Sequence, residues 1–261
     1  MNIQWDAEKY TNDFSFVHQY GSSLLDLIDG ENLSVLDLGC GSGALTKELA
    51  ERGCDAEGID ASAELLQTAR THYPELRFTQ ADAVSFQMGR QFDVVFSNAV
   101  FHWIDREKQA DMIAHVFDAL KPQGQFIFEF GGHGNNALIH GALARAFEAR
   151  NLTYQMPFYF PTVGEYASLL EQGGFVVRTA LLLDRPTRLN GGDGLCEWIR
   201  MFVKAPFEGI GPDLREEIIR SAAADLEVIL CHNGSWYADY VRLQCKAVKP
   251  LVRKKKKENS S

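Results

Sequence analysis

The sequence predicts an α/β fold, in which a mostly parallel sheet carries helices on both faces. From about residue 33 to residue 130, apolar runs of strand length alternate with segments of helical pattern. Such alternation requires a parallel sheet flanked by helices. A glycine-rich turn at 39–43 joins the first apolar run to a helix. With 261 residues and 46% hydrophobic side chains, the chain can bury this core in one domain and still add a cap.

Local signals set the boundaries of the first elements. Gly53 is typical of the position just after a helix, Ser62 is a good N-cap, and Pro74 separates a helix from the next strand. We expect strands at 33–38, 55–59, 76–80, 92–97 and 125–130, and helices at about 44–52, 62–72 and 107–120. The run at 92–97 has the pattern of a strand buried on both faces.

The alternation changes after the fifth strand. We expect helices at 138–150 and 163–172, a sixth strand at 175–183, a helix through Trp198, a helix from Pro212 and a seventh strand within 236–248. Insertions at about 131–173 and 190–234 are expected to pack together as a helical cap over one end of the sheet. The chain then divides into an N-terminal lid segment at 1–32, a domain at 33–252 and a disordered basic tail at 253–261.

Charge is distributed unevenly. The formal net charge is −9. The tail at 253–258 contributes five basic residues and one acid, or +4, so the rest of the chain carries −13. An acidic body is a poor match for nucleic acid, because binding there depends on neutralising phosphates. We therefore expect a small-molecule partner and no nucleic acid.

Cysteine usage and hydropathy favour a cytoplasmic protein. The five cysteines are scattered and never spaced as Cys-x-x-Cys, which argues against a disulfide framework and against a metal site. No apolar run is long enough for a membrane span, and the N-terminus shows no signal-peptide pattern. The sequence leaves the oligomeric state open.

Candidate ligand-binding residues lie at or just after the ends of four of the expected strands. Gly39, Gly41 and Gly43 let a ligand lie against the backbone, because no Cβ is in the way. Asp37 precedes this turn, Asp60 ends the second strand, and Asp82 and Asn98 follow the third and fourth. In an open parallel sheet these strand ends meet where ligands bind, and an acid in the place of Asp60 suits ribose hydroxyls.

The same residues resemble the motifs of class I S-adenosylmethionine (SAM)-dependent methyltransferases. Leu36 to Gly43 resembles the family's first motif, and Asp93 to Asn98 its fourth-strand motif. The wider chain is similar to the methyltransferase type 11 and trans-aconitate methyltransferase branch, through Trp5…Tyr10, Asn98 to Trp103, the aromatic block before Tyr166 and Glu197-Trp198-Ile199. The resemblance implies a Rossmann-like sheet of seven strands.

The resemblance also implies a SAM site on the glycine turn. Asp37 would lie near the amino group of SAM, Asp60 would hold the ribose and Asp82 would lie on the adenine side. Ala61 is smaller than the residue many members place against adenine, so Leu65 or Ala83 would fill that side. The residues expected to bind the cofactor are Asp37, Gly39, Cys40, Gly41, Gly43, Asp60, Ala61, Leu65, Ala81, Asp82, Ala83, Asn98 and Ala99.

The methyl acceptor implied by the resemblance is a small molecule, with a carboxylic acid the favoured class. A carboxylate needs no general base, whereas an amine or hydroxyl needs one, and His102 is the candidate. The residues expected to bind the acceptor are Tyr10, Trp103, Tyr159, Trp198, Arg200 and Trp236. Two other functions stay open: a non-catalytic SAM-binding protein, and an NAD-dependent oxidoreductase that shares the glycine pattern.

Overall fold

The computed structural model describes residues 21–251. Tyr10, most of the expected lid segment and the expected basic tail lie outside this range. Within it, no helix combines the length and hydropathy that a membrane span requires. The same range holds no group of three or more His, Cys, Asp or Glu side chains placed to bind a metal ion.

Seven strands form the main sheet, as expected. In spatial order they are β3 (Arg77–Gln80), β2 (Asp55–Asp60), β1 (Ser34–Leu38), β4 (Phe92–Asn98), β5 (Leu120–Gly131), β8 (Ser235–Val248) and β6 (Val176–Arg188). The first five run parallel, and β8 is antiparallel to both of its neighbours. A two-residue strand, β7 (Cys231–His232), forms a hairpin with the start of β8. The order reverses at β1 and β4, so the carboxyl ends of these two strands mark the ligand-binding crevice.

Apolar side chains of the strands point to both faces of the sheet, so helices cover both faces. On one face, α5 (Gln109–Ala119) and α7 (Val163–Gln172) pack against side chains that include Phe126 and Phe128. On the other, α3 (Ala44–Glu51) packs against Val35 and Ile127. A fourth helix, α4 (Ala63–His72), begins at its Ser62 N-cap and covers Phe78.

Four short 3₁₀ segments occur among these elements, and one of them takes the place of the first turn of an expected α-helix. They are η1 (Leu25–Leu27), η2 (Phe101–Trp103), η3 (Arg106–Lys108) and η4 (Ala205–Phe207). The helix expected from residue 107 begins instead at Gln109, after η3. Two strands are longer than expected, because β5 extends back to Leu120 and β6 forward to Arg188.

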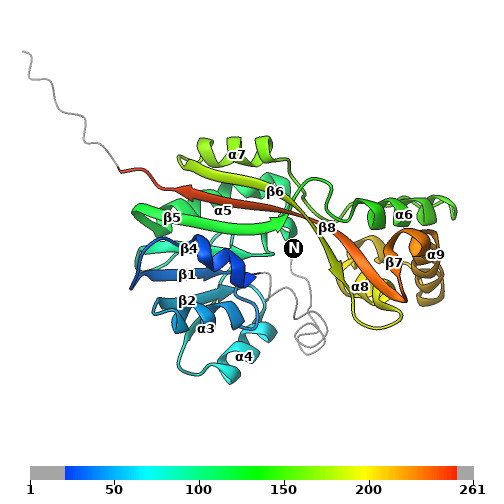
Figure 1. Cartoon of the computed structure of the whole chain (residues 1–261), viewed down its shortest axis with the longest axis horizontal. Helices are drawn as coiled ribbons and strands as arrows, with labels where there is room; N and C mark the ends of the chain where they lie inside the picture. The colour runs from blue at the N-terminus through cyan, green and yellow to red at the C-terminus, as the bar shows by residue number, and fades with distance from the viewer. Residues whose placement is uncertain (1–20, 252–261) are drawn as a thin grey trace, which may run out of the picture.

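Strands β6 and β8 continue beyond the sheet as a two-stranded ribbon. Pairing of β5 with β8 ends at Gly131 and Arg242, whereas pairing of β6 with β8 continues to Arg188 and Tyr237. Figure 1 shows α6 (Ala137–Glu148), α8 (Gly194–Phe202) and α9 (Pro212–Leu230) grouped at the far end of this ribbon. They enclose a second hydrophobic core. These three helices and the core between them make up the helical cap.

The cap contains less of the first insertion than the sequence suggested. Helix α6 packs in the cap core, but α7 packs on the sheet, where Tyr166 and Leu170 are fully buried. The reason lies in their apolar faces: Tyr166 meets Phe128 and Phe130 of β5 at ring-centroid distances of 5.5 and 4.9 Å. Between the two helices, the chain returns from the cap to the sheet through the aromatic block at 158–160.

Candidate active site

The glycine turn after β1 is anchored at one end and open at the other. The N–H groups of Gly39 and Cys40 both donate to the carbonyl of Ile59, at 2.8 and 3.0 Å. Gly39 has a φ of 77°, and a Cβ there would lie 2.2 Å from a methyl carbon of Val100. Gly41 has a φ of 55°, and a Cβ there would meet nothing within 4 Å. The backbone at Gly41 therefore borders open space, in which a ligand can approach it.

Asp60 joins the ends of β1 and β2. Its carboxylate accepts hydrogen bonds from the N–H of Gly41 at 2.9 Å and from the N–H of Ser62 at 2.8 Å. Burial raises the pKa of Asp60, while these backbone donors act in the opposite direction. The carboxylate thus lies beside the open part of the glycine turn.

Asp37 is buried behind the same turn. Its carboxyl group is 2% exposed and accepts a hydrogen bond from Thr46 Oγ1 at 2.6 Å. Burial raises the pKa of Asp37 to about 7; the bond from Thr46 opposes the shift, and the charge of Asp60 adds to it. A cationic group bound nearby would favour the ionised form.

The other expected cofactor residues surround this crevice. Ala81 donates its N–H to the carbonyl of Asp60 at 3.0 Å, and exposed Asp82 accepts from Val84 at 3.1 Å. Leu65 is buried in α4, and Cys40 packs there too, its thiol pKa raised mainly by burial. Ala61 is exposed, and Ala83, Asn98 and Ala99 are half-buried at the ends of β3 and β4.

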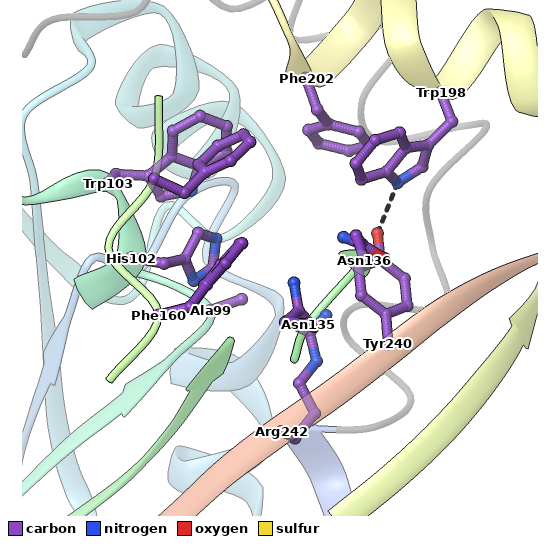
Figure 2. A pocket seen from close by; sticks show the side chains of 11 residues that line it. Ala99, His102, Trp103, Asn135, Asn136, Phe160, Trp198, Phe202, Tyr240 and Arg242 are labelled. Atoms are coloured by element: carbon purple, nitrogen blue, oxygen red, sulfur yellow. Dashed lines mark hydrogen bonds between the residues drawn. The ribbon is translucent and has the colours of Figure 1, made fainter. Parts of the chain in front are cut away.

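A pocket opens between the sheet and the cap. Figure 2 shows side chains from the loop after β4, the loop after β5, the aromatic block, α8 and β8 converging on it. It encloses about 430 Å³ of space, including the solvent at its open mouth. The lining residues are Ala99, His102, Trp103, Asn135, Asn136, Phe158, Phe160, Trp198, Phe202, Tyr240 and Arg242. Since Ala99 directly follows β4, the pocket adjoins the crevice at the strand ends.

His102 lies at one wall of the pocket, with its tautomer set by the backbone. The N–H of Gly131 donates to His102 Nδ1 at 3.3 Å, so the neutral ring carries its hydrogen on Nε2. The pKa of His102 is well below its usual value because the ring is buried and Arg242 is nearby. The lowered pKa favours the neutral ring, which offers an N–H donor and is a weak base.

Arg242 and Tyr240 lie on the β8 side of the pocket. The guanidinium carbon of Arg242 is 4.2 Å from the ring centroid of Tyr240, and the Arg242 residue is 6% exposed. Tyr240 in turn accepts a hydrogen bond from Trp198 Nε1 at 2.6 Å. Strand and cap helix are thus joined at the pocket, next to a permanent positive charge.

The sequence comparisons identify the family. Residues 35–124 match the model of a methyltransferase domain. An uncharacterised methyltransferase of Schizosaccharomyces pombe is 31% identical over 92% of this chain and 96% of its own length. The chain belongs to the SAM-dependent methyltransferases. Trans-aconitate 2-methyltransferase of Deinococcus radiodurans is 32% identical over 66% of this methyltransferase and 70% of its own length.

A solved structure shares the fold. The structure of phosphoethanolamine N-methyltransferase 2 of Haemonchus contortus with SAM superposes with a TM-score of 0.56 at 17% identity. The superposition covers 89% of this methyltransferase and 52% of the Haemonchus chain. The likeness to this structure shows the shared fold, and SAM as the cofactor follows from the family to which the chain belongs.

The structure separates the expected acceptor residues of the methyltransferase into two sets. Trp103 and Trp198 line the pocket. Tyr159 points to Glu165, to which its hydroxyl donates at 3.0 Å, and Trp236 donates to the carbonyl of Gly192 at 3.1 Å. Arg200 is held by Asp193, Glu197 and Glu216 in the cap. These last three expected residues are absent from the pocket lining that the structure describes.

Sequence reasoning missed several lining residues, above all Arg242. It lies in the apolar strand segment Val241-Arg242-Leu243, where a charged residue facing a buried side is unusual. That signal was available in the last strand. Asn135 and Asn136 follow the glycines after β5, and their approach to β8 depends on long-range contacts: the N–H of Val241 donates to Asn135 Oδ1 at 2.9 Å.

Proposed function

We propose that this methyltransferase forms a methyl ester on a small carboxylic acid bound in the pocket between sheet and cap. The observation that carries the proposal is that Arg242 and His102 both line this pocket. Arg242 supplies a permanent positive charge, and His102 supplies an N–H donor through a tautomer fixed by Gly131. Both groups can donate hydrogen bonds to an ionised carboxylate.

The glycine turn and its acids are proposed to hold SAM. The open space at Gly41 accommodates a ligand lying against the backbone. Asp60, beside that space, suits a pair of ribose hydroxyls, and Asp37 suits the ammonium group of the methionine part. Ala99 links this site to the pocket, since it follows the end of β4 and also lines the pocket.

SAM supplies an electrophilic methyl group, so a carboxylate oxygen forms the new C–O bond as the C–S bond breaks, giving a methyl ester and S-adenosylhomocysteine with no proton to remove. The residues of the chain have the task of alignment. Arg242 and His102 orient the acid, and the aromatic side chains exclude water. Alignment of this kind can contribute on the order of 7–11 kcal/mol to catalysis.

An amine acceptor fits the pocket less well. An alkylamine is protonated at neutral pH and must lose a proton before it attacks. Among the described lining residues there is no carboxylate to take that proton, and His102 already carries a hydrogen on Nε2. The Deinococcus relative is named for a carboxylic acid acceptor, trans-aconitate, which supports the acid class.

The pocket also favours an enzyme over a non-catalytic SAM-binding protein. A protein that only bound SAM would have no need of an acceptor cavity beside the strand ends. Here an aromatic pocket with a buried cation adjoins them.

A turnover screen tests the proposed function. The full chain is incubated with methyl-labelled SAM and panels of carboxylic acids, amines and phenols, and label is counted in the base-labile ester fraction. We expect label in esters of one or more acids. Transfer confined to amines or phenols would overturn the acid assignment, and SAM binding with no transfer to any panel would support the non-catalytic function.

A further inference from the structure

We propose that the acceptor is a monocarboxylic acid with an apolar body, oriented by Arg242, and that di- and tricarboxylic acids are poor acceptors. This inference rests on the proposed ester-forming function and narrows its substrate class. It departs from the acceptor named for the Deinococcus relative, which is a tricarboxylic acid. The argument depends on the charges and the aromatic surface of the pocket.

Arg242 is the one lysine or arginine among the lining residues that the structure describes. His102 adds a neutral donor, as its fixed tautomer shows. The nearby amides are partly committed, because Asn135 Oδ1 accepts from the backbone of Val241. Among the described lining residues, Arg242 is thus the single charged partner for a carboxylate.

Two further cations, one on the ribbon and one on the cap, are paired with acids of this chain. On the ribbon, Arg185 binds Glu129 through both guanidinium nitrogens, with the second contact at 2.9 Å. On the cap helix α8, Arg200 contacts three acids, the nearest at 2.6 Å. A second or third carboxylate on the acceptor would have to compete with these acids, and burying it without a partner is unfavourable.

The long-range field acts in the same direction. Outside its basic tail the chain carries a net charge of −13. A polyanionic acceptor is repelled more strongly than a singly charged one as it approaches. One buried cation can offset this repulsion for one carboxylate.

Aromatic side chains form most of the remaining wall. Six of the lining residues are aromatic: Trp103, Phe158, Phe160, Trp198, Phe202 and Tyr240. Trp103 meets Phe158 edge to face at 4.8 Å between centroids, and Trp198 lies 5.3 Å from Phe202. Figure 2 shows Trp103 and Phe202 facing one another across the pocket, with Arg242 rising from β8. Such walls bury an apolar body.

The two features define an orientation for the acceptor. Arg242 and His102 hold one oxygen of the carboxylate, and Ala99 leads from that point toward the crevice at the strand ends. The apolar body then lies against Trp198 and Phe202 of α8. The cap helix α8 thus selects the shape of the apolar body, while Arg242 of β8 selects a negatively charged head group.

The first test compares acceptors. We measure kcat/KM of the full chain for 3-phenylpropionate, decanoate and trans-aconitate, with phenethylamine as the amine probe. We expect at least one monocarboxylate to exceed trans-aconitate by about tenfold or more, because a mismatched charged group is rejected strongly. Faster turnover of trans-aconitate would overturn this inference and leave ester formation intact. Turnover of the amine alone would overturn both.

The second test addresses Arg242 through a ratio that misfolding cannot imitate. We compare inhibition by the best monocarboxylate's methyl-inert sulfonate analogue and by its neutral amide, in the parent and in Arg242→Gln. A charge-assisted contact predicts that the parent prefers the anion by about 10–150-fold, and that the preference falls toward one in the variant. An unchanged ratio would overturn the role of Arg242.

Controls separate charge from folding. Arg242→Lys keeps the charge and should recover part of the preference, although a lysine lacks the planar fork. Arg188→Gln alters an exposed residue at the end of the same ribbon and should leave the ratio at the parent value. Calorimetric SAM affinity serves as the folding check for all three variants. A similar loss of preference in Arg188→Gln would point to general surface charge and overturn the assignment.

Discussion

At the scale of single residues, Asp60 is the side chain on which we expect SAM binding to depend most. It already binds the N–H groups of Gly41 and Ser62, whereas exposed Asp82 accepts from Val84 within its own loop. We expect Asp60→Ala to weaken SAM binding by about 10²–10⁴-fold, since it removes two charge-assisted bonds to ribose hydroxyls, each contributing roughly 1.5–3 kcal/mol. Asp82→Ala should weaken it less. Isothermal calorimetry with SAM measures both.

Asp60→Asn is the matched control for that prediction. The amide oxygen can still accept one backbone hydrogen bond, so the glycine turn is held while the charge is lost. Its affinity should lie between those of the parent and Asp60→Ala. Equal and negligible losses in all three variants would contradict the proposed position of the ribose.

His102 supports a second prediction at this scale. Burial and Arg242 keep its pKa well below the usual value, which favours the neutral ring, and an acid acceptor is ionised throughout pH 6–9. At saturating SAM, whose ammonium group would keep Asp37 ionised, we expect kcat/KM for the acid to be flat between pH 6 and 9. His102→Gln, which keeps an N–H donor, should retain more activity than His102→Ala. Stopped assays with the identified acid measure these profiles.

A general base would behave differently. Its removal costs about 10²–10⁴-fold, and glutamine cannot replace it. A large loss in both variants, with parent activity falling as the pH is lowered from 7 to 6, would therefore contradict the donor role of His102.

At the scale of elements, two glycines of the same turn are expected to have different roles. Gly39 should affect folding, and Gly41 should affect SAM binding. A Cβ at Gly39 would overlap Val100, at 2.2 Å, whereas a Cβ at Gly41 would enter open space. Gly39→Ala should lower the melting temperature by several degrees. Gly41→Ala adds modest strain, about 1–2 kcal/mol for a left-handed residue, yet should abolish measurable SAM binding. Differential scanning fluorimetry with and without SAM distinguishes the two effects.

The opposite pattern would refute this division of roles. A Gly41→Ala protein that binds SAM normally would show that the cofactor does not lie against that backbone. A fully stable Gly39→Ala protein would show that the turn can move away from Val100.

The elements that could be predicted from the sequence are those specified by neighbouring residues. Strands β1 and β4 carry mostly apolar runs, the turn at 39–43 has its glycines in sequence, and α4 has its own cap at Ser62. The glycine turn and Asp60 followed from the same local signals. The structure places both in one crevice.

The pocket was harder to predict because it depends on pairing between distant strands. Arg242 reaches it because β8 pairs with β5 and β6 in one particular register. Tyr159 and Arg200 had the right chemistry and the right neighbourhood, but Glu165 holds the first and three acids hold the second. Such partners cannot be read from composition or periodicity.

At the scale of the whole molecule, two hydrophobic cores share one pair of strands. Figure 1 shows the cap helices joined to the sheet where β6 and β8 extend beyond it, and residues from both parts line the pocket. Polar groups buried at this junction belong to both parts. His140 of α6 is one of them: its ring is 5.4 Å from Phe158 and 6.4 Å from Trp198, and its Nδ1 lies 2.6 Å from the hydroxyl of Tyr154.

Burial lowers the pKa of His140 to about 4, which predicts a specific acid sensitivity of the fold. Above pH 6.5 both the folded and unfolded states hold a neutral ring, so the stabilising effect is fully present. As the pH falls below 6.5, the unfolded state binds a proton that the folded state does not, and the free energy of unfolding falls. At pH 5 the loss from this one residue is about 2 kcal/mol.

Other groups titrate in the same range, so the prediction concerns a difference between proteins. Asp37 acts in the opposite direction, because its raised pKa favours the folded state as the pH falls from 7 toward 4. Urea unfolding of the parent and of His140→Gln should therefore be compared at pH 7.5 and pH 5. The stability advantage of the parent should shrink by about 2 kcal/mol on acidification. Tyr154→Phe keeps the buried imidazole and should retain the parent's acid sensitivity. If His140→Gln loses stability with pH as steeply as the parent does, the junction between cap and sheet does not hold the histidine neutral.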